Sequence, residues 1–420
     1  MLPESQPSSQ AQDATHGMTI AQLILSGLGL IISLLASAGL AIYGVAGIFG
    51  STPDLQSATA TFSVAAIFLL TACLAIPSLM SSIRHLSGRD MLRPKLSVNT
   101  FKLASFGLVV WALVLGLGSL ISRSTQLAWL LLPPLQLLAI GLPIWWIFEF
   151  ARRGISVGSP QRGWGIINFG LFITTPALMV IEILVLLGLV LGFAVWASQN
   201  GAVMQALAGL SAQINRARGN PQALLPILMP FLKNPVTIFA ILAIVAGLMP
   251  MIEELFKPLA LWALAGRRLT PAQGFVGGAL CGAAFALIES LFYLSMPMGE
   301  SWAALAVGRT GTCLLHITTS ALVGWAMAEA WEKGAYLRLG VTYLLAVGLH
   351  GLWNGLSIIS GLTAFLNPAP SNMQSLLSIS RVAPYAIAAL LALICALLWG
   401  SHHRLVQNSR SVEANTADLL

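Results

Sequence analysis

Three ionisable residues stand close together in a segment that is otherwise apolar. Glu253, Glu254 and Lys257 lie between two uncharged flanks, residues 236–249 and 259–265. A run of this kind, about 30 residues long, can cross a bilayer. Each charge near the bilayer centre costs roughly 2.5–3.5 kcal/mol on insertion scales. Because a helix with no use for these groups would not carry that cost, the pattern indicates a functional site with partners on other helices.

Three further apolar segments each carry one group suited to acid–base chemistry or to ligand binding. These groups are Glu289, His316 and His350. At about 1.5 Å per helical residue, each lies ~20–24 Å from the cytoplasmic end of its segment, as Glu253 does. Scattered structural polar groups have no reason to share one depth. We therefore expect these side chains to meet near the middle of the membrane.

Spacing within each segment adds neighbours to these groups. Glu253 and Lys257 are four residues apart and share a helix face, so they can pair, whereas Glu254 points about 100° away from Glu253. Helical spacing places three further pairs on a common face: Phe285 with Glu289, Arg309 with His316, and His350 with Asn354. Each candidate group thus has a second residue beside it on its own helix.

These motifs, in this order, resemble those of the PrsW family of intramembrane proteases, distant relatives of the CAAX-processing and bacteriocin-processing membrane proteases. The motifs are Glu253-Glu254-x-x-Lys257, Phe285-x-x-x-Glu289, a lone His316 and His350-x-x-x-Asn354. Ser290 departs from the pattern, since many relatives carry Asn there. The resemblance implies hydrolysis of a peptide bond inside the membrane. The implied substrate is a single-span membrane protein, such as an anti-sigma factor.

Hydrolysis of a peptide bond needs an activated water, a donor to the oxyanion and a proton for the leaving amine. A carboxylate in a low-dielectric site holds a proton more readily, so Glu253 or Glu254 can act as general base while the other pairs with Lys257. Asn354 and His350 can donate hydrogen bonds to the oxyanion. We predict six catalytic residues, Glu253, Glu254, Glu289, His316, His350 and Asn354, and three supporting residues, Lys257, Phe285 and Arg309.

A metal version of this chemistry stays open. Catalytic zinc takes three protein ligands and leaves a position for water, and the candidate ligands here are Glu254, Glu289, His316 and His350. No HExxH motif is present in the sequence. Zinc therefore rests on residue types alone, and the sequence favours a water activated by glutamate without a cofactor.

A proton-coupled transporter or proton relay is the competing class of function. Chains of intramembrane Glu, Lys and His also mark proton pathways, and broken helices near the midplane fit transport. A transporter should show an internal repeat with matching interruptions in both halves. The first half of this chain lacks the acids of the second half, which favours the hydrolase.

Composition sets the class of fold. The chain has 420 residues, of which 57% are hydrophobic and only 8% charged, whereas soluble domains have about 25% charged residues. The apolar runs are long and continuous, which is typical of membrane helices and not of barrel strands. The net charge of +7 does not indicate nucleic acid, because the basic residues are spread over short loops. We predict an all-α, polytopic bundle of about ten spans in a lipid bilayer.

The predicted spans follow the apolar runs. They cover residues 19–49, 58–80, 101–121, 127–149, 164–198, 236–265, 273–296, 302–331, 335–362 and 382–400. The fourth contains Pro133, Pro134 and Pro143 and should be kinked or broken, because proline removes a helical hydrogen bond. Glycines at 274, 277, 278 and 282 give the seventh span a small-residue face for close helix packing.

Charge bias orients these spans. With the N-terminus inside, 14 Lys and Arg residues fall on the inner loops and the C-terminal tail, against four on the outer loops. The positive-inside rule then predicts that both termini are cytoplasmic. The resemblance adds a bacterial cytoplasmic membrane as the expected location.

The polar residues divide the chain into segments of different character. We predict a polar N-terminal tail (1–17), an appended membrane domain of about five spans (18–199), an outer loop or amphipathic segment (200–235), a catalytic membrane domain (236–362), a final loop and span (363–400) and a cytoplasmic tail (401–420). Met204, Leu207, Leu210 and Ile214 recur at helical spacing in the outer segment, which suits a helix lying on the membrane surface.

Overall fold

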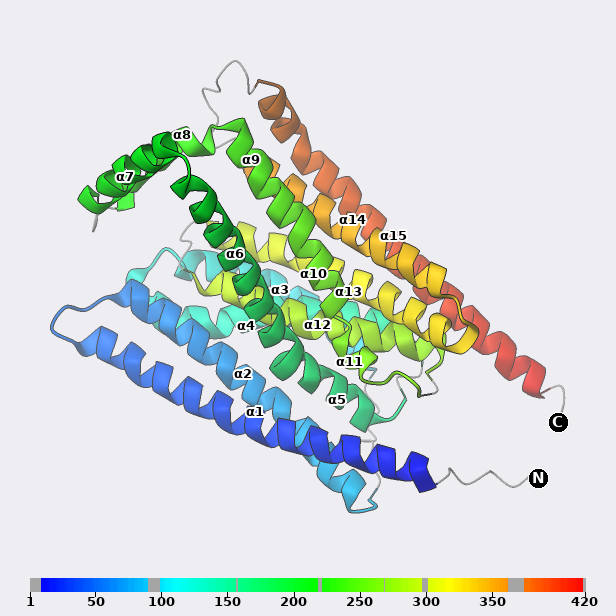
Figure 1. The fold of residues 1–420 in the computed structure, drawn as a ribbon. Coiled ribbons are helices and arrows are strands. Elements are labelled where there is room, and N and C mark those ends of the chain that lie inside the picture. Colours follow the sequence, from blue (N-terminus) through cyan, green and yellow to red (C-terminus); the bar gives the residue numbers. More distant parts are fainter. Residues whose placement is uncertain are drawn as a thin grey trace. The chain divides into compact units, whose positions relative to one another are not determined.

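The protein is a bundle of helices in the part of the chain that the structure, a computed structural model, describes (Figure 1). That part comprises residues 9–89, 99–155, 158–217, 221–267, 269–296, 301–361 and 374–417. The elements are α1 (Ser9–Phe49), α2 (Leu55–Leu86), α3 (Thr100–Ile121), α4 (Thr125–Arg152), α5 (Pro160–Phe169), the π-helical turn η1 (Gly170–Thr174), α6 (Thr175–Ser198), α7 (Gly201–Arg216), α8 (Pro221–Leu232), α9 (Pro235–Leu242), the π-helical turn η2 (Ala243–Leu248), α10 (Met249–Phe256), α11 (Leu259–Trp262), α12 (Pro271–Ser295), α13 (Trp302–Lys333), α14 (Tyr336–Gly361) and α15 (Gln374–Ala417). The predicted all-α fold class is confirmed.

Ten helical segments among the described residues are long and apolar enough to cross a membrane. They are His16–Phe49, Leu55–Leu86, Thr100–Ile121, Thr125–Arg152, Pro160–Ser198, Pro235–Trp262, Pro271–Ser295, Trp302–Lys333, Tyr336–Gly361 and Gln374–Asn408. This confirms the predicted number of spans. The last span is longer than predicted because α15 continues through polar residues on both sides of its apolar centre.

Prolines act differently in the fourth and sixth spans. The fourth was expected to kink or break, yet α4 runs as one helix through Pro133, Pro134 and Pro143. In the sixth span, α10 ends at Phe256 and Pro258 caps the short helix α11. A proline lacks the N–H of a helical hydrogen bond and its ring clashes with the preceding turn. The break at Pro258 therefore places Lys257 in a turn between two helices.

Two π-helical turns interrupt spans that the sequence presents as continuous. The turn η1 lies between α5 and α6, and η2 lies between α9 and α10, directly before the acidic pair. A π-helical turn holds one extra residue, so it rotates the following helix relative to the preceding one, and such turns occur often at functional sites. Apolar residues fill α- and π-helical turns equally, which is why the sequence did not reveal them.

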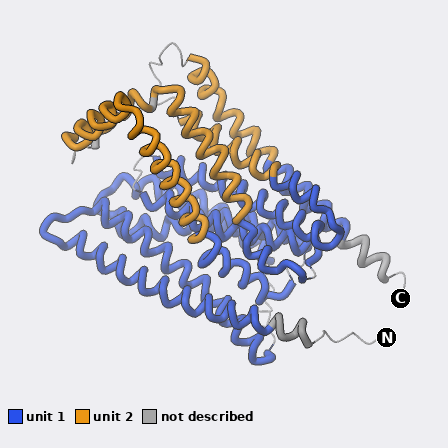
Figure 2. Tube along the Cα trace, in the orientation of Figure 1, with its two compact units in different colours: residues 1–175, 257–343, 394–420 blue, residues 176–256, 344–393 orange. Residues whose placement is uncertain are grey.

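The described chain forms two compact units, coloured separately in Figure 2. Unit 1 contains residues 1–175, 257–343 and 394–420. Its centre is formed by α12 and α13, whose apolar windows are 89% and 94% buried, whereas no other span exceeds 39%. A helix surrounded by protein on all sides can carry polar groups away from lipid, so α12 and α13 are suited to hold them.

Glycines bring α12 and α13 into close contact. A methyl group added to Gly274, Gly278 or Gly282 of α12 would come closer than 3.0 Å to a backbone carbonyl of α13. Gly277 faces Leu261 of α11 instead. The predicted small-residue face is therefore present, and three of its four glycines serve the α12–α13 contact. Because backbones can approach this closely only without side chains between them, these glycines fix the distance between the two helices.

The N-terminal helices of unit 1 pack against the same pair. The ring of Trp302, at the start of α13, is fully buried and occupies the space where a side chain on Gly118 of α3 would lie. Gln136 of α4 donates a hydrogen bond of 2.6 Å to the carbonyl oxygen of Leu294 in α12. The helices α2, α3 and α4 thus pack against α12 or α13.

Unit 2 contains residues 176–256 and 344–393. Residues 200–235 were predicted to form either an outer loop or an amphipathic segment. In the structure, the helices α7 and α8 lie in this part of the chain. Ile238 of α9 packs against Leu377 of α15. Gly351 of α14 lies so close to the carbonyl of Ala246 in η2 that no side chain would fit between them. The end of α14 is thereby held against the turn that precedes α10.

The predicted segment boundaries cross these units, because unit 1 combines the first spans with α11, α12, α13 and both ends of the chain. The predicted boundaries follow the distribution of polar and apolar residues along the chain, and they stay a prediction. Residues 1–8 of the predicted N-terminal tail, 363–373 of the final loop and 418–420 of the C-terminal tail lie outside the described residues.

Candidate functional site

The side chains predicted to do chemistry form two groups, one within each unit. Unit 2 holds Glu253, Glu254, His350 and Asn354, and unit 1 holds Lys257, Phe285, Glu289, Arg309 and His316. The two groups are joined through the chain at α10, because only two residues separate Glu254 from Lys257. Each group is built from residues that the sequence singled out.

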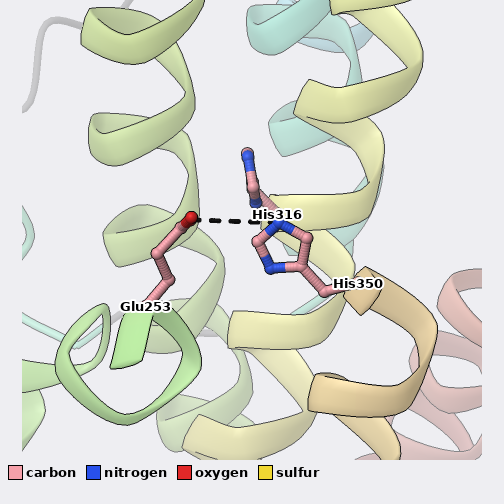
Figure 3. Close-up of side chains that lie close together, drawn as sticks. All are labelled: Glu253, His316 and His350. Carbon is pink, nitrogen blue, oxygen red and sulfur yellow. Dashed lines mark ion pairs between the residues drawn. The ribbon is translucent and has the colours of Figure 1, made fainter. Parts of the chain in front are cut away.

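The group in unit 2 centres on His350 of α14. Its Nδ1 lies 2.8 Å from Oε1 of Glu254, and its Nε2 lies 3.9 Å from Oε2 of Glu253. Figure 3 shows His350 facing Glu253, with a dashed line between them. All three side chains are buried, Glu254 completely. The pattern predicted that these residues meet, and within this unit they do.

The hydrogen bond to Glu254 determines how His350 can act. An ionised carboxylate can only accept, so Nδ1 carries the proton and donates it to Glu254. The neutral ring then has its lone pair on Nε2, on the side of Glu253. In this form Nε2 can accept a proton or bind a metal, and it cannot donate to an oxyanion. That bears against the predicted role of neutral His350 as an oxyanion donor.

Asn354 lies one helical turn beyond His350 and is bound to the backbone of η2. Its Nδ2 donates a hydrogen bond of 3.1 Å to the carbonyl oxygen of Val245. The π-helical turn presents this carbonyl, so the turn and Asn354 together tie α14 to the chain that leads into α10. The structure thus gives Asn354 a positioning contact, and its predicted role as an oxyanion donor stays a prediction.

The group in unit 1 is a line of hydrogen bonds across three elements. Nζ of Lys257 lies 2.7 Å from Nδ1 of His316, and Nε2 of His316 lies 2.9 Å from Oε2 of Glu289. Arg309 donates from its guanidinium to the same oxygen of Glu289. Lys257 and His316 are completely buried. The line therefore runs from the turn after α10, through α13, to α12, and returns to α13.

The cations at the two ends of this line of hydrogen bonds determine which nitrogen of His316 carries the proton. A lysine ammonium and an arginine guanidinium have only donors, so Nδ1 of His316 accepts from Lys257 and Nε2 donates to Glu289. Arg309 stabilises the ionised form of Glu289 by a direct ion pair. Glu289 thus acts as an anion that orients His316, which leaves it poorly suited to donate a proton to a leaving group.

Phe285 contacts both ends of the Lys257–His316 bond. Its ring centroid lies 4.6 Å from Nζ of Lys257, in a cation–π contact, and 5.1 Å from the His316 ring at an interplanar angle of 86°. An aromatic face attracts a cation most strongly where water is excluded. The supporting role predicted for Phe285 from its spacing to Glu289 thus has a second reason, since the ring also holds Lys257.

Two residues of this group were not predicted to belong to it. Ser290 accepts a hydrogen bond of 3.1 Å from Nε of Arg309 and lies 3.3 Å from Sγ of Cys313. The sequence noted Ser290 only as a departure from the usual Asn. The signal was the position of Ser290, directly after Glu289 and therefore within reach of a cation that pairs with that acid.

The structure gives Lys257 a contact that its spacing did not predict. Because α10 ends at Phe256, Lys257 lies in the turn before Pro258, and its Nζ lies 2.7 Å from Nδ1 of His316. The predicted pairing of Lys257 with Glu253 or Glu254 stays a prediction.

Three of these side chains are of the kinds that hold a metal ion, Glu253, His316 and His350 (Figure 3). One carboxylate and two imidazoles form a donor set of catalytic zinc. Within unit 2, the 3.9 Å between Nε2 of His350 and Oε2 of Glu253 is longer than a hydrogen bond. It is also shorter than the roughly 4.1 Å that two metal–ligand bonds can span. A carboxylate on the other ring nitrogen, as Glu254 provides, is the usual partner of a metal-binding histidine. Glu253 and His350 therefore fit a metal.

Comparison with known proteins gives one match. Residues 183–379 match the model of a protein family described as PrsW family intramembrane metalloprotease. The match contains both groups of side chains and begins within the fifth span. No curated protein and no solved structure matches the chain.

Proposed function

We propose that the chain, a multi-pass membrane protein whose residues 183–379 match the model of the PrsW family of intramembrane metalloproteases, cuts a peptide bond of a membrane-embedded substrate at Glu253, Glu254 and His350. The observation that carries the proposal is the buried hydrogen bond between Glu254 and Nδ1 of His350. It leaves the lone pair of Nε2 on the side of Glu253. This is the arrangement that a hydrolytic metal site requires.

We propose that Glu253 and His350 hold the metal. Zinc bound there would polarise the scissile carbonyl and lower the pKa of a bound water. The sequence alone favoured a water activated without a cofactor. The tautomer of His350 supports the metal version, because it suits a ligand and not a hydrogen-bond donor to the oxyanion.

Glu254 is the residue we propose as general base. Oε1 accepts from His350, and the same carboxylate has a second oxygen with which to take a proton from water. It is completely buried. Glu289 remains ionised beside Arg309 and orients His316. Asn354 keeps α14 in place against η2.

The substrate and the location are carried by the resemblance. We propose a single-span membrane protein as substrate, such as an anti-sigma factor, and the bacterial cytoplasmic membrane as the location, with both termini in the cytoplasm.

The first test replaces the proposed base and the proposed ligand separately. Glu254→Gln keeps an oxygen for His350 and loses the ability to take a proton, so cleavage should fall by roughly 10²- to 10⁴-fold while metal binding persists. Glu253→Gln should lose both cleavage and metal. Membranes of cells that produce each variant are compared with wild type for single-span proteins that remain full length, and metal content is measured on the purified protein.

Glu332→Gln is the matched control, because Glu332 is an exposed carboxylate of α13, and it should behave as wild type. Unchanged cleavage by both Glu254→Gln and Glu253→Gln would remove the assignment. Loss of cleavage in both variants, with equal metal content in all proteins, would favour the glutamate version without metal.

A proton relay is the second candidate, and the line from Lys257 through His316 to Glu289 favours it. A relay has to release its proton at both ends. Arg309 closes one end of the line, and a guanidinium does not give up its proton in proteins, so the line suits positioning better than transport. Proton-coupled uptake by proteoliposomes containing the protein would reverse this preference.

A further inference from the structure

One face of α14 carries both His350 and the contact with the π-helical turn η2. Gly351, Asn354 and Gly355 follow His350 within the next turn and a half of the helix, so all four lie on the same side of α14. Both elements belong to unit 2 in this region. His350 lies at the level of α10 and Asn354 at the level of η2. The fit of α14 against η2 therefore bears directly on the position of His350.

Two glycines let the backbones of α14 and η2 approach each other. A methyl group added to Gly351 would come closer than 3.0 Å to the carbonyl oxygen of Ala246. One added to Gly355 would lie 3.5 Å from Cβ of Ala246, an ordinary van der Waals contact. Small residues spaced four apart are a common means by which membrane helices pack closely. Ala246 thus packs against two successive turns of α14.

Asn354 adds a polar contact to this packing. Its Nδ2 donates a hydrogen bond of 3.1 Å to the carbonyl oxygen of Val245, the residue before Ala246. A π-helical turn replaces the regular backbone bonds of an α-helix by bonds to the fifth residue along the chain. A side-chain amide that donates to a carbonyl of such a turn stabilises the turn in this form. Asn354 is thereby oriented by η2.

The extra residue of η2 determines the direction in which α10 presents its acids. Successive residues of an α-helix point about 100° apart, so a regular α-helix in place of η2 would rotate Glu253 and Glu254 relative to α9. In the structure both carboxylates face one imidazole. Glu254 lies 2.8 Å from Nδ1 of His350, and Glu253 lies 3.9 Å from Nε2.

We propose that Asn354 is a positioning residue that acts through η2. Together with Gly351 and Gly355 it holds the π-helical turn against α14, and this contact places His350 between Glu253 and Glu254. The inference rests on the proposed function, because it concerns the same histidine.

This role differs from that of an oxyanion donor, in which Asn354 would contact the substrate itself. A hydrogen bond to the substrate cannot be replaced by a covalent bond elsewhere in the protein. A contact that holds two helices together can be replaced in this way. The two roles of Asn354 therefore predict different outcomes for a rescue by a disulfide bond.

The experiment introduces that disulfide bond in the full-length protein. The Cβ atoms of residues 246 and 355 would lie 3.5 Å apart, within the range of disulfide-bonded cysteines. Asn354→Ala should lower cleavage by on the order of 10²-fold, as displacement of a reacting group does, and should weaken the binding of Co²⁺ at Glu253 and His350. Ala246→Cys with Gly355→Cys, added to Asn354→Ala and oxidised, should restore most of both, and reduction should remove the gain.

Three controls accompany the rescue. The exposed cysteines Cys73 and Cys395 are replaced by alanine in every protein, so that oxidation acts on the introduced pair. The same pair with Asn354 intact should cleave as the parent protein does when oxidised. Ala246→Cys with Leu352→Cys should neither form the bond nor restore cleavage, because Leu352 is exposed on α14.

A second variant tests the contact without removing any hydrogen-bond donor. Gly351→Ala places a methyl group against the carbonyl of Ala246, so it should lower cleavage and Co²⁺ affinity together. Gly348→Ala on the same helix meets nothing within 4 Å and should behave as wild type. Thermal unfolding of each protein separates displacement of α14 from loss of the fold.

Each other outcome decides against a stated part. Full cleavage in Asn354→Ala or in Gly351→Ala overturns the positioning role, and so does a disulfide bond that fails to form or to restore cleavage. If Asn354→Ala loses cleavage without rescue and keeps full Co²⁺ affinity, Asn354 contacts the oxyanion and the proposed function stands. Unchanged cleavage in both Glu253→Gln and Glu254→Gln removes the proposed function, and this inference falls with it. Absence of Co²⁺ binding in wild type removes the metal alone, and the rescue of cleavage still decides on Asn354.

Discussion

At the scale of single residues, Arg309 shows how a charged side chain outside the reaction can determine which nitrogen of a neighbouring histidine carries the proton. It donates to Glu289 and, through Nε, to Ser290, and its guanidinium lies 4.5 Å from the centroid of the Tyr293 ring. Three neighbours therefore fix its direction. Because Glu289 then stays ionised, His316 keeps its proton on Nε2, and Nδ1 is left as the acceptor for Lys257.

Replacement of Arg309 should weaken the reaction without removing any group that contacts the substrate. We expect Arg309→Met to lower kcat/KM by about 10- to 100-fold, the usual cost of losing a residue that orients a ligand. Arg309→Lys should recover part of the loss, because it restores the charge next to Glu289. Cleavage is measured together with thermal unfolding; full activity in Arg309→Met would show that Glu289 needs no counter-charge.

The sequence predicted the residues of both groups but not all of their partners. The energetic cost of Glu253, Glu254 and Lys257 in an apolar span indicated these residues directly. That cost can be read from the sequence of one span, without knowledge of the other helices. The partner of Lys257 depends on where α10 ends, which is a property of the backbone. The role of Ser290 depends on the side chain opposite it on α13. Neither can be derived from spacing along one helix.

At the scale of elements, the contact between α12 and α13 places Glu289 beside His316. Gly282 lies against the carbonyl of His316 itself, so a side chain there would push on the residue that carries the imidazole. The small-residue face was visible in the sequence because glycine is costly in a helix without a packing reason. The π-helical turns η1 and η2 were not visible, since they change hydrogen bonding without changing composition.

The same contact yields a prediction with a control on the neighbouring helix. Gly282→Ala should lower the unfolding temperature, because overpacking costs about 1–3 kcal/mol, and it should lower cleavage through the displacement of His316. Gly308→Ala on α13 meets nothing within 4 Å and should be neutral or slightly stabilising. Equal unfolding temperatures for the two variants would contradict the close contact.

At the scale of the whole molecule, helices outside the family match support helices inside it. The match covers residues 183–379, whereas Gly118 of α3 and Gln136 of α4 precede it and contact Trp302 and Leu294 within it. The first spans appeared as an appended domain because they carry none of the candidate site residues. Their contribution to unit 1 is packing, which residue chemistry does not reveal.

Because of this packing, we expect a substitution far from the site in sequence to affect both stability and cleavage. Gly118→Leu would meet the ring of Trp302, so we expect a lower unfolding temperature and reduced cleavage. Gly116→Leu on the same helix meets nothing within 4 Å and should leave both unchanged. The two proteins are compared by thermal unfolding in detergent and by cleavage in membranes. A wild-type profile for Gly118→Leu would mean that the first spans do not support α13.

The glycines between α12 and α13 also constrain how this chain can evolve. Every amino acid that one base change can reach from a glycine codon carries a Cβ atom. At Gly274, Gly278 and Gly282 that atom would meet a carbonyl of the other helix. Every base change there that alters the amino acid therefore disturbs the contact between the two helices. We expect these three glycines to tolerate substitution less well than Gly116 and Gly308, where an added methyl group meets nothing within 4 Å.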